Sequence, residues 1–174
     1  MRSTCSRLVF WPTAFSKICG YADEKLFSPL TFNLDEALVW SDYAMNGVFV
    51  GQKNFQTLSA RASVLIKLGR NKEADSLMKA AMPMGSMQEL HQYGRQLIRM
   101  KKPVEALVAY KLNAQKNPDN FTTSVGLVRG YSAIGDYKNA LKQARLALPK
   151  APDKGNKDNL EAMIKKLEER KDVN

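Results

Sequence analysis

One spacing recurs along this chain of 174 residues and restricts its fold more than any other feature. Three similar segments, "LGRNKEAD", "MKKPVEAL" and "IGDYKNAL", carry an alanine at Ala74, Ala106 and Ala140, with separations of 32 and 34 residues. Such a period is typical of arrays in which each repeat is one supersecondary unit that cannot bury its hydrophobic face alone. The spacing therefore predicts stacked units, each made of two helices and a tight turn.

The last unit, which begins at Phe121, shows the expected register most fully. Gly135 suits the end of a first helix, and Asp136 is placed to cap the second. A stripe of small residues at helical spacing, which lets two helices approach closely, follows at Ala140, Ala144 and Ala147. Pro152 closes the unit because proline cannot continue a helix.

Comparable units precede it. The middle unit begins at Ser86, which forms a capping box with Glu89, and Pro103 suits the first position of its second helix. The shorter spacing of 32 residues in the first unit predicts an irregular turn near Pro83. The predicted repeats are residues 55–86, 87–120 and 121–152.

Two flanking helices complete the predicted domain, residues 33–174. Residues 33–46, with Asn33 as the cap, have the pattern of a half repeat. Residues 156–171 are predicted to form a capping helix, with a polar outer face, such as an open-ended stack requires. We expect eight helices from Asn33 onward and no sheet. Residues 1–32 are predicted to be an irregular leader, either an artefact or a remnant of a longer protein.

A helix–turn–helix unit of about 34 residues is the tetratricopeptide pattern. The predicted fold is therefore all-α, a tetratricopeptide-like α-solenoid: a right-handed superhelix of helical hairpins with a C-terminal capping helix. The chain also resembles the C-terminal tetratricopeptide region of two-domain bacterial proteins whose N-terminal part is a mostly β domain of unknown function. The resemblance is carried by "FVGQKNFQTLSARASVLIKLGR", "MQELHQYGRQLI", "FTTSVGLVRGYSAIGDYK" and "ALPKAPDKGNKDNLEAMIKKLEERKDVN".

This resemblance implies a helical repeat module without known catalysis, in a family whose members are exported. Residues 1–32 do not resemble the family's preceding domain, so a truncated gene, a misframed reading and an engineered junction all remain open. We expect a cytoplasmic protein from the chain as it stands, and an exported or periplasmic one if it is a fragment of the family.

The charge balance favours an acidic partner. The chain has 27 basic and 17 acidic residues, a formal charge of +10, and long-range attraction then acts on negatively charged molecules. Nucleic acid is the less favoured partner, because basic residues do not alternate with the aromatic residues that single-strand binders use for stacking. No stretch approaches the eighteen apolar residues of a membrane span.

No catalytic, metal or cofactor motif is present. His91 is the one histidine, without an acidic partner on its helical face, so a catalytic triad is not expected. Cys5 and Cys19 lack further ligands at metal-binding spacing, and the HExxH, GxxxxGKS and GxGxxG motifs are absent. The sequence predicts a protein that is not an enzyme and binds no cofactor.

The predicted binding surface is the inner groove of the superhelix, lined by the first helix of each unit. Arg95 and Arg129 are one repeat apart and are expected to be neighbours, with Arg99 one turn from Arg95. Three guanidinium groups would suit carboxylates of an extended acidic peptide. The residues expected in the groove are Gln56, Ser63, Lys67, Gln88, His91, Gln92, Arg95, Arg99 and Arg129, with Thr122 and Ser132 beside them.

Two alternatives stay open at this point. The arginines would have no ligand if they were simply solvated or paired with acidic residues of the next helix. The whole module would have no ligand if it were a structural accessory of a larger two-domain protein. The lysines and asparagines of the carboxylate clamp in tetratricopeptide chaperone adaptors are not reproduced, which disfavours a chaperone tail as the partner.

Overall fold

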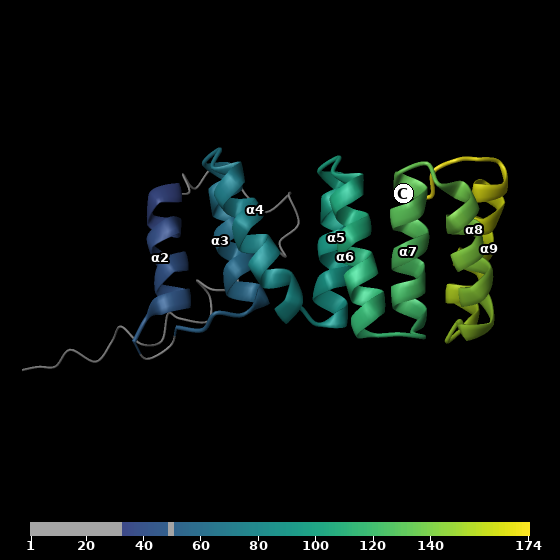
Figure 1. Cartoon of the computed structure of the whole chain (residues 1–174), viewed down its shortest axis with the longest axis horizontal. Helices are drawn as coiled ribbons and strands as arrows, with labels where there is room; N and C mark the ends of the chain where they lie inside the picture. Colours follow the sequence, from purple (N-terminus) through teal and green to yellow (C-terminus); the bar gives the residue numbers. More distant parts are fainter. Residues whose placement is uncertain (1–32, 49–50) are drawn as a thin grey trace, which may run out of the picture. The chain divides into compact units, whose positions relative to one another are not determined.

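The computed structural model describes residues 33–48 and 51–174, so the predicted leader lies outside the described residues. Within them the chain forms eight α-helices, two short 3-10 helices and no strand (Figure 1). The α-helices are α2 (Leu34–Asn46), α3 (Phe55–Lys67), α4 (Asn71–Ala81), α5 (Met87–Arg99), α6 (Pro103–Lys116), α7 (Phe121–Ala133), α8 (Tyr137–Ala147) and α9 (Lys154–Glu168). The predicted all-α class and the eight helices from Asn33 onward are confirmed.

Three helix pairs, α3–α4, α5–α6 and α7–α8, are joined by the same turn. In each turn, the N–H that precedes the second helix donates to the carbonyl five residues earlier: Arg70 to Leu65 (2.8 Å), Lys102 to Leu97 (2.9 Å) and Asp136 to Tyr131 (2.9 Å). The preceding residue has a positive φ, 75° at Gly69, 57° at Lys101 and 80° at Gly135. Glycine adopts this conformation most easily, so Lys101 is the strained member of the set.

The alanines that define the repeat spacing occupy one place in these hairpins. Ala74, Ala106 and Ala140 each stand fourth in the second helix and are 0% exposed. Their N–H groups donate to the carbonyls of Arg70, Lys102 and Asp136, at 3.0 to 3.2 Å. A methyl side chain at this point lets the two helices approach closely. The sequence spacing therefore marks the same local structure three times.

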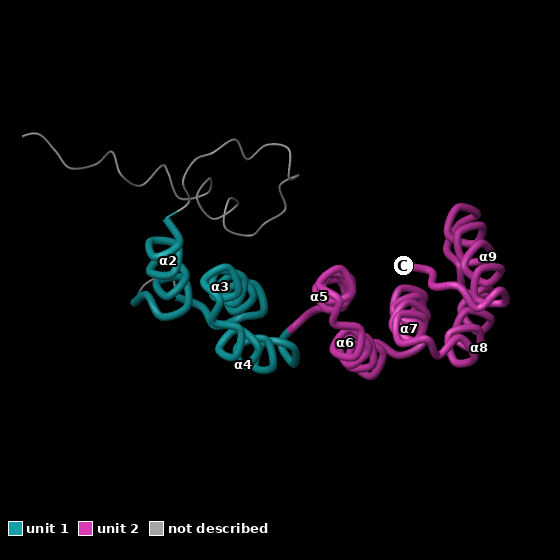
Figure 2. Tube along the Cα trace, turned by 90° about the horizontal axis from the view of Figure 1, so that it is seen from above, with its two compact units in different colours: residues 1–84 teal, residues 85–174 magenta. Residues whose placement is uncertain are grey.

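The chain divides into two compact units, one ending at Met84 and the other comprising Gly85–Asn174 (Figure 2). The boundary follows a 3-10 helix, η2 (Met82–Met84), which is the irregular turn expected near Pro83. The sequence pattern predicted one domain over residues 33–174 and gave no sign of this division.

In the first unit, α2 packs on α3 and α3 packs on α4. Helix α2 buries Ala37, Ser41 and Met45, while Trp40 is 49% exposed. Arg61 of α3 ties the two helices together, because its guanidinium donates to the Leu38 carbonyl at 3.3 Å and pairs with Asp42 at 3.2 Å.

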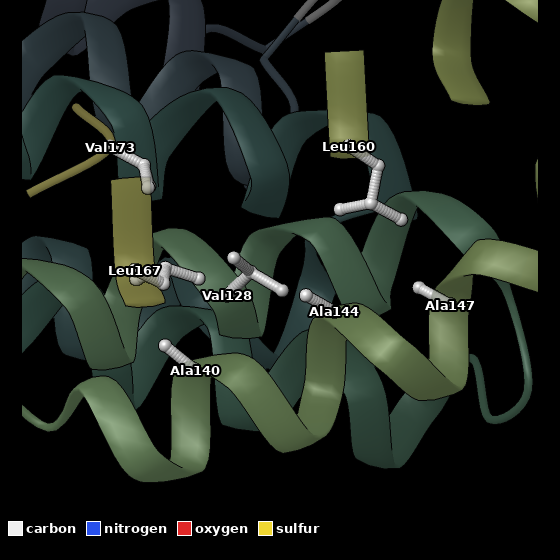
Figure 3. Close-up of a cluster of buried hydrophobic side chains, with 7 residues drawn as sticks. All are labelled: Val128, Ala140, Ala144, Ala147, Leu160, Leu167 and Val173. Carbon is white, nitrogen blue, oxygen red and sulfur yellow. The ribbon is translucent and has the colours of Figure 1, made fainter. Parts of the chain in front are cut away.

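In the second unit the helices alternate between two rows (Figure 2). Helices α5 and α7 lie in one row and contact each other, while α6 and α8 lie in the other. After α9 the chain returns to α7, so the C-terminal segment lies beside that helix (Figure 2). The core at this end joins α7, α8, α9 and this segment through Val128, Ala140, Ala144, Ala147, Leu160, Leu167 and Val173 (Figure 3).

The caps agree with the sequence pattern, but the last helix is displaced from its predicted bounds. Ser86 and Glu89 form the expected capping box, and Pro103 begins α6. Helix α9 spans Lys154–Glu168 rather than 156–171, because the Asp153 carboxylate accepts the Asn156 N–H (2.8 Å) and starts the helix earlier. Its end comes earlier as well, since Arg170 turns the chain with φ at 53°.

Candidate functional site

The floor of the candidate site is the ring of Tyr110, on α6. This side chain is 0% exposed, and glycines of the two neighbouring helices face it. A methyl group at Gly94 of α5 would come within 2.5 Å of the ring, and methyl groups at Gly126 and Gly130 of α7 within 2.7 and 2.9 Å. Real side-chain carbons do not approach a ring so closely. Glycine at these positions therefore lets α5 and α7 close over the ring.

The Tyr110 hydroxyl is buried and has no hydrogen-bond partner among the described residues. Burial raises the pKa of Tyr110 to about 12, although Arg129 and Arg95 act to lower it. The hydroxyl is therefore protonated at neutral pH and remains a donor without an acceptor. A buried donor left in this state costs roughly 1 to 3 kcal/mol relative to a satisfied one.

His91 of α5 carries the second buried polar atom without a partner in the described part of the chain, Nδ1. Its ring centre is 5.7 Å from that of Tyr110, with the planes inclined at 57°. Burial lowers the pKa of His91, Arg129 and Arg95 lower it further, and a hydrogen bond to the Thr122 backbone acts against them. The imidazole is therefore neutral at pH 7.

Two guanidinium groups stand beside these atoms. Arg129 of α7 is half-buried and Arg95 of α5 is exposed. Burial lowers the pKa of Arg129 and the Arg95 charge lowers it further, while Tyr110 and Asp172 act to raise it. Among residues 33–48 and 51–174, neither guanidinium forms an ion pair or a hydrogen bond. We call His91, Arg95, Tyr110 and Arg129 the α5–α7 site, which combines uncompensated positive charge with unpartnered buried polar atoms.

Asp172 is the nearest carboxylate that acts on Arg129, and it is already engaged. Ser132 Oγ donates to its Oδ1 at 2.7 Å, and the Asn174 side chain donates to the same oxygen at 2.8 Å. Burial acts to raise the pKa of Asp172, but these hydrogen bonds outweigh it and the pKa is lowered. Its charge is therefore shared with neutral donors and compensates Arg129 only in part.

The structure brings together some of the predicted groove residues and not others. Arg95 and Arg129 both act electrostatically on His91, and Arg95 acts on Arg129, whereas Arg99 is not among the charges that act on His91 or Arg129. Gln88, Gln92 and Arg99 are exposed on α5. Ser132 is 2% exposed and bonded to Asp172, so it serves the C-terminal segment rather than a ligand. Gln56, Ser63 and Lys67 lie on α3 in the first unit, where Ser63 Oγ donates to the Ser59 carbonyl.

Sequence reasoning missed Tyr110 as a site residue. Its position in the repeat is that of a core aromatic, and nothing in the pattern separates a packing ring from one with a free hydroxyl. The signal that could have found it is the combination of a tyrosine, rather than phenylalanine, with glycines in the first helices of two successive units, Gly94 and Gly126.

A contrasting arginine lies in the first unit. Arg61 borders a depression on α3 and α4 together with Leu65, Lys72, Glu73, Ser76 and Leu77. Its guanidinium pairs with Asp42 at 3.2 Å, and Glu73 beside it is paired with Arg70 at 2.6 Å. The positive charge there is compensated within the unit, which distinguishes this depression from the α5–α7 site.

Other kinds of site are not found in the described residues. No three of their His, Cys, Asp and Glu side chains gather closely enough to hold a metal ion. None of the described helices combines the length and apolar character needed to cross a membrane.

No family model, curated protein or solved structure matches this chain.

Proposed function

We propose that this protein is a non-enzymatic interaction module, built from tetratricopeptide-like hairpins, that binds an extended acidic segment of another protein at the α5–α7 site. The observation that carries the proposal is that the Arg95 charge acts on the half-buried Arg129 while neither guanidinium forms an ion pair in the described residues, and Asp172 offsets Arg129 only in part. Two guanidinium groups that act on each other where one is partly buried raise the free energy of the folded state unless an anion binds beside them.

The chemistry of the two side chains favours carboxylate groups. A guanidinium donates two parallel hydrogen bonds in a plane that matches a carboxylate, and each charge-assisted bond contributes roughly 1.5 to 3 kcal/mol. The overall charge of +10 adds long-range attraction for acidic segments. The site lies on three helices of one unit, α5, α6 and α7, so it does not depend on how the two units are arranged.

A second candidate is a structural accessory module with no ligand of its own, and nucleic-acid binding is a third. The repeated hairpins support the first of these, because the two hairpins of the second unit pack on one another through α5, α6 and α7. The formal charge of +10 supports nucleic-acid binding. Both lack an explanation for the unpartnered atoms of His91 and Tyr110.

The experiment measures binding of a library of acetylated acidic peptides to the full chain and to two variants, Arg95→Ala and Arg129→Ala. We expect each variant to weaken the best peptides by roughly one order of magnitude or more, with the larger loss at the half-buried Arg129. The matched control is Arg145→Ala, which removes the same charge from an exposed position on α8 where Arg145 pairs with Glu168 at 3.1 Å.

The outcomes separate the candidates. If Arg145→Ala and Arg129→Ala lose equal peptide affinity, net charge alone attracts the peptides, and the proposal of a binding site at α5–α7 is refuted. No binding of any peptide would favour the accessory module. Tight binding of an oligonucleotide of arbitrary sequence, lost steeply as salt is raised, would favour nucleic acid instead.

A further inference from the structure

We infer that the α5–α7 site holds one carboxylate group, which accepts a hydrogen bond from the buried Tyr110 hydroxyl while Arg95 and Arg129 bind it from the rim. This inference rests on the proposed function and names the chemical group that anchors the ligand. It assigns the core tyrosine of α6 a part in recognition, in addition to its part in packing.

The surroundings of the Tyr110 side chain differ from one side to another. Backbone at Gly94, Gly126 and Gly130 encloses the ring, so that even a methyl group has no room on those sides. The charges of Arg95 and Arg129 act on Tyr110, and the centre of the His91 ring lies 5.7 Å from that of Tyr110. The proposed ligand enters on the side of these three residues, where Arg95 is exposed.

The donors at this point fit an anionic acceptor. The two guanidinium groups are donors only, the Tyr110 hydroxyl has a hydrogen to donate, and none of the three has a hydrogen-bond partner in the described residues. A carboxylate presents two oxygens in a plane, enough for one inner bond and a guanidinium on the outer side. A phosphate monoester carries up to two negative charges and loses more hydration on entering a partly buried place.

The imidazole adapts to such a group. The charged and titratable groups around His91 are Arg95 on its own helix, Tyr110 on α6 and Arg129 on α7, and the Thr122 backbone also acts on it. When a carboxylate offsets the two positive charges, protonation of the imidazole becomes easier and both of its nitrogens are then donors. His91 is the one histidine of the chain, so its ring resonances report on the site without ambiguity.

The test uses Tyr110→Phe in the full chain, because this change removes the hydroxyl and keeps the ring against the three glycines. The probes are acetylated hexapeptides with one glutamate, and the same peptides with glutamine or phosphoserine in its place. We expect Tyr110→Phe to weaken the glutamate peptide roughly tenfold, to leave the weak glutamine peptide unchanged, and to unfold at the same or a higher urea concentration. If Tyr110 had a purely structural role, a variant that is no less stable than wild type would not bind the peptide more weakly.

Tyr131→Phe is the control, since Tyr131 lies on α7 with Lys111 over its ring and outside the site. It should leave the affinity unchanged. The inference is overturned if the glutamate peptide binds wild type and Tyr110→Phe equally, if the phosphoserine peptide binds more tightly than the glutamate peptide, or if saturating peptide leaves the His91 resonances unmoved. In all three cases the proposed function survives as long as Arg129→Ala weakens binding. If Arg129→Ala has no effect either, the proposed function fails with it.

Discussion

Replacing Gly94 by alanine tests the packing on which the floor of the site depends. The added methyl group would lie 2.5 Å from Cε1 and Cζ of the Tyr110 ring and 3.0 Å from Cδ1. Contacts between carbon atoms are favourable at about 3.5 to 4.0 Å, so the overlap is close to 1 Å. The ring cannot move away toward α7, because it already lies against the backbone at Gly126 and Gly130.

Two terms of opposite sign set the expected change in stability. Overpacking a closed core costs about 1 to 3 kcal/mol, and an overlap of this size belongs near the upper end. Alanine in place of glycine inside a helix stabilises by about 1 kcal/mol. We therefore expect Gly94→Ala to lower the free energy of unfolding by about 1 to 2 kcal/mol, against the direction that helix propensity alone predicts.

The measurement is urea unfolding followed by far-ultraviolet circular dichroism, since both tryptophans, Trp11 and Trp40, precede the second unit. Gly155→Ala is the matched control: it lies in the first turn of α9, and its methyl group would meet only the Asp153 carboxylate oxygen at 3.3 Å. This variant should be neutral or slightly more stable than wild type.

Variants of the ring itself identify the cause. In a Tyr110→Leu background the overlap disappears, so Gly94→Ala should become neutral or stabilising, with a coupling of at least about 1 kcal/mol. In a Tyr110→Phe background the ring remains and the cost should persist. A Gly94→Ala protein as stable as wild type, or an equal cost in the leucine background, would refute the packing argument.

Three further predictions concern single positions. The pKa of His91 is lowered in the folded state, because burial disfavours the charged imidazole. The contribution of His91 to the free energy of unfolding is therefore fully present above the unfolded-state pKa of about 6.5, and it is lost as pH falls through the folded-state pKa. His91→Gln should flatten this loss in urea titrations from pH 7.5 to 5. Lys101→Gly should stabilise by about 1 kcal/mol, because glycine accepts the φ of 57° without strain, whereas Gly135→Ala should destabilise. Val173→Ala should cost about 1 kcal/mol in the same assay, because it removes buried methyl groups from the contact with α8 and α9.

Much of the local structure could be predicted because it depends on short-range rules. Alanine at a fixed place in each hairpin, serine and aspartate caps, and glycine after a helix are each decided within a few residues. Ala74, Ala106 and Ala140 accordingly have the same environment, and Asp136 accepts the Asn139 N–H at 3.1 Å as its position suggested. Among the three hairpin turns, the rule is broken at Lys101, where the turn has a positive φ and the sequence has no glycine.

The place of the C-terminal segment could not be predicted, because it depends on contacts between distant parts of the chain. The segment after α9 is held by Ser132, which accepts the Val173 N–H at 3.1 Å and donates to Asp172. Nothing in the sequence around Ser132 indicates a partner forty residues away. The same contact explains why Ser132, expected in the groove, is closed to solvent.

The site was predicted in part for a similar reason. Repeat spacing placed Arg95 and Arg129 in corresponding positions, and the structure brings their charges together. Burial, however, is a property of the assembled unit, so the pattern could not tell that Arg129 is half-buried while Arg99 is exposed on the helix that carries Arg95. It also could not show that the Tyr110 hydroxyl lacks an acceptor.

Packing and recognition meet in this one side chain. The Tyr110 ring fills the space that three glycines leave between α5, α6 and α7, and phenylalanine would fill the same space without burying a hydroxyl. Packing alone therefore favours phenylalanine over tyrosine at position 110, because phenylalanine avoids the free-energy cost of an unsatisfied buried donor. The hydroxyl lowers the free energy of the molecule only when an acceptor reaches it, and the two arginines are the groups that would attract one. If Tyr110→Phe proves more stable than wild type yet binds acidic peptides less tightly, then the hydroxyl destabilises the free protein and stabilises the complex.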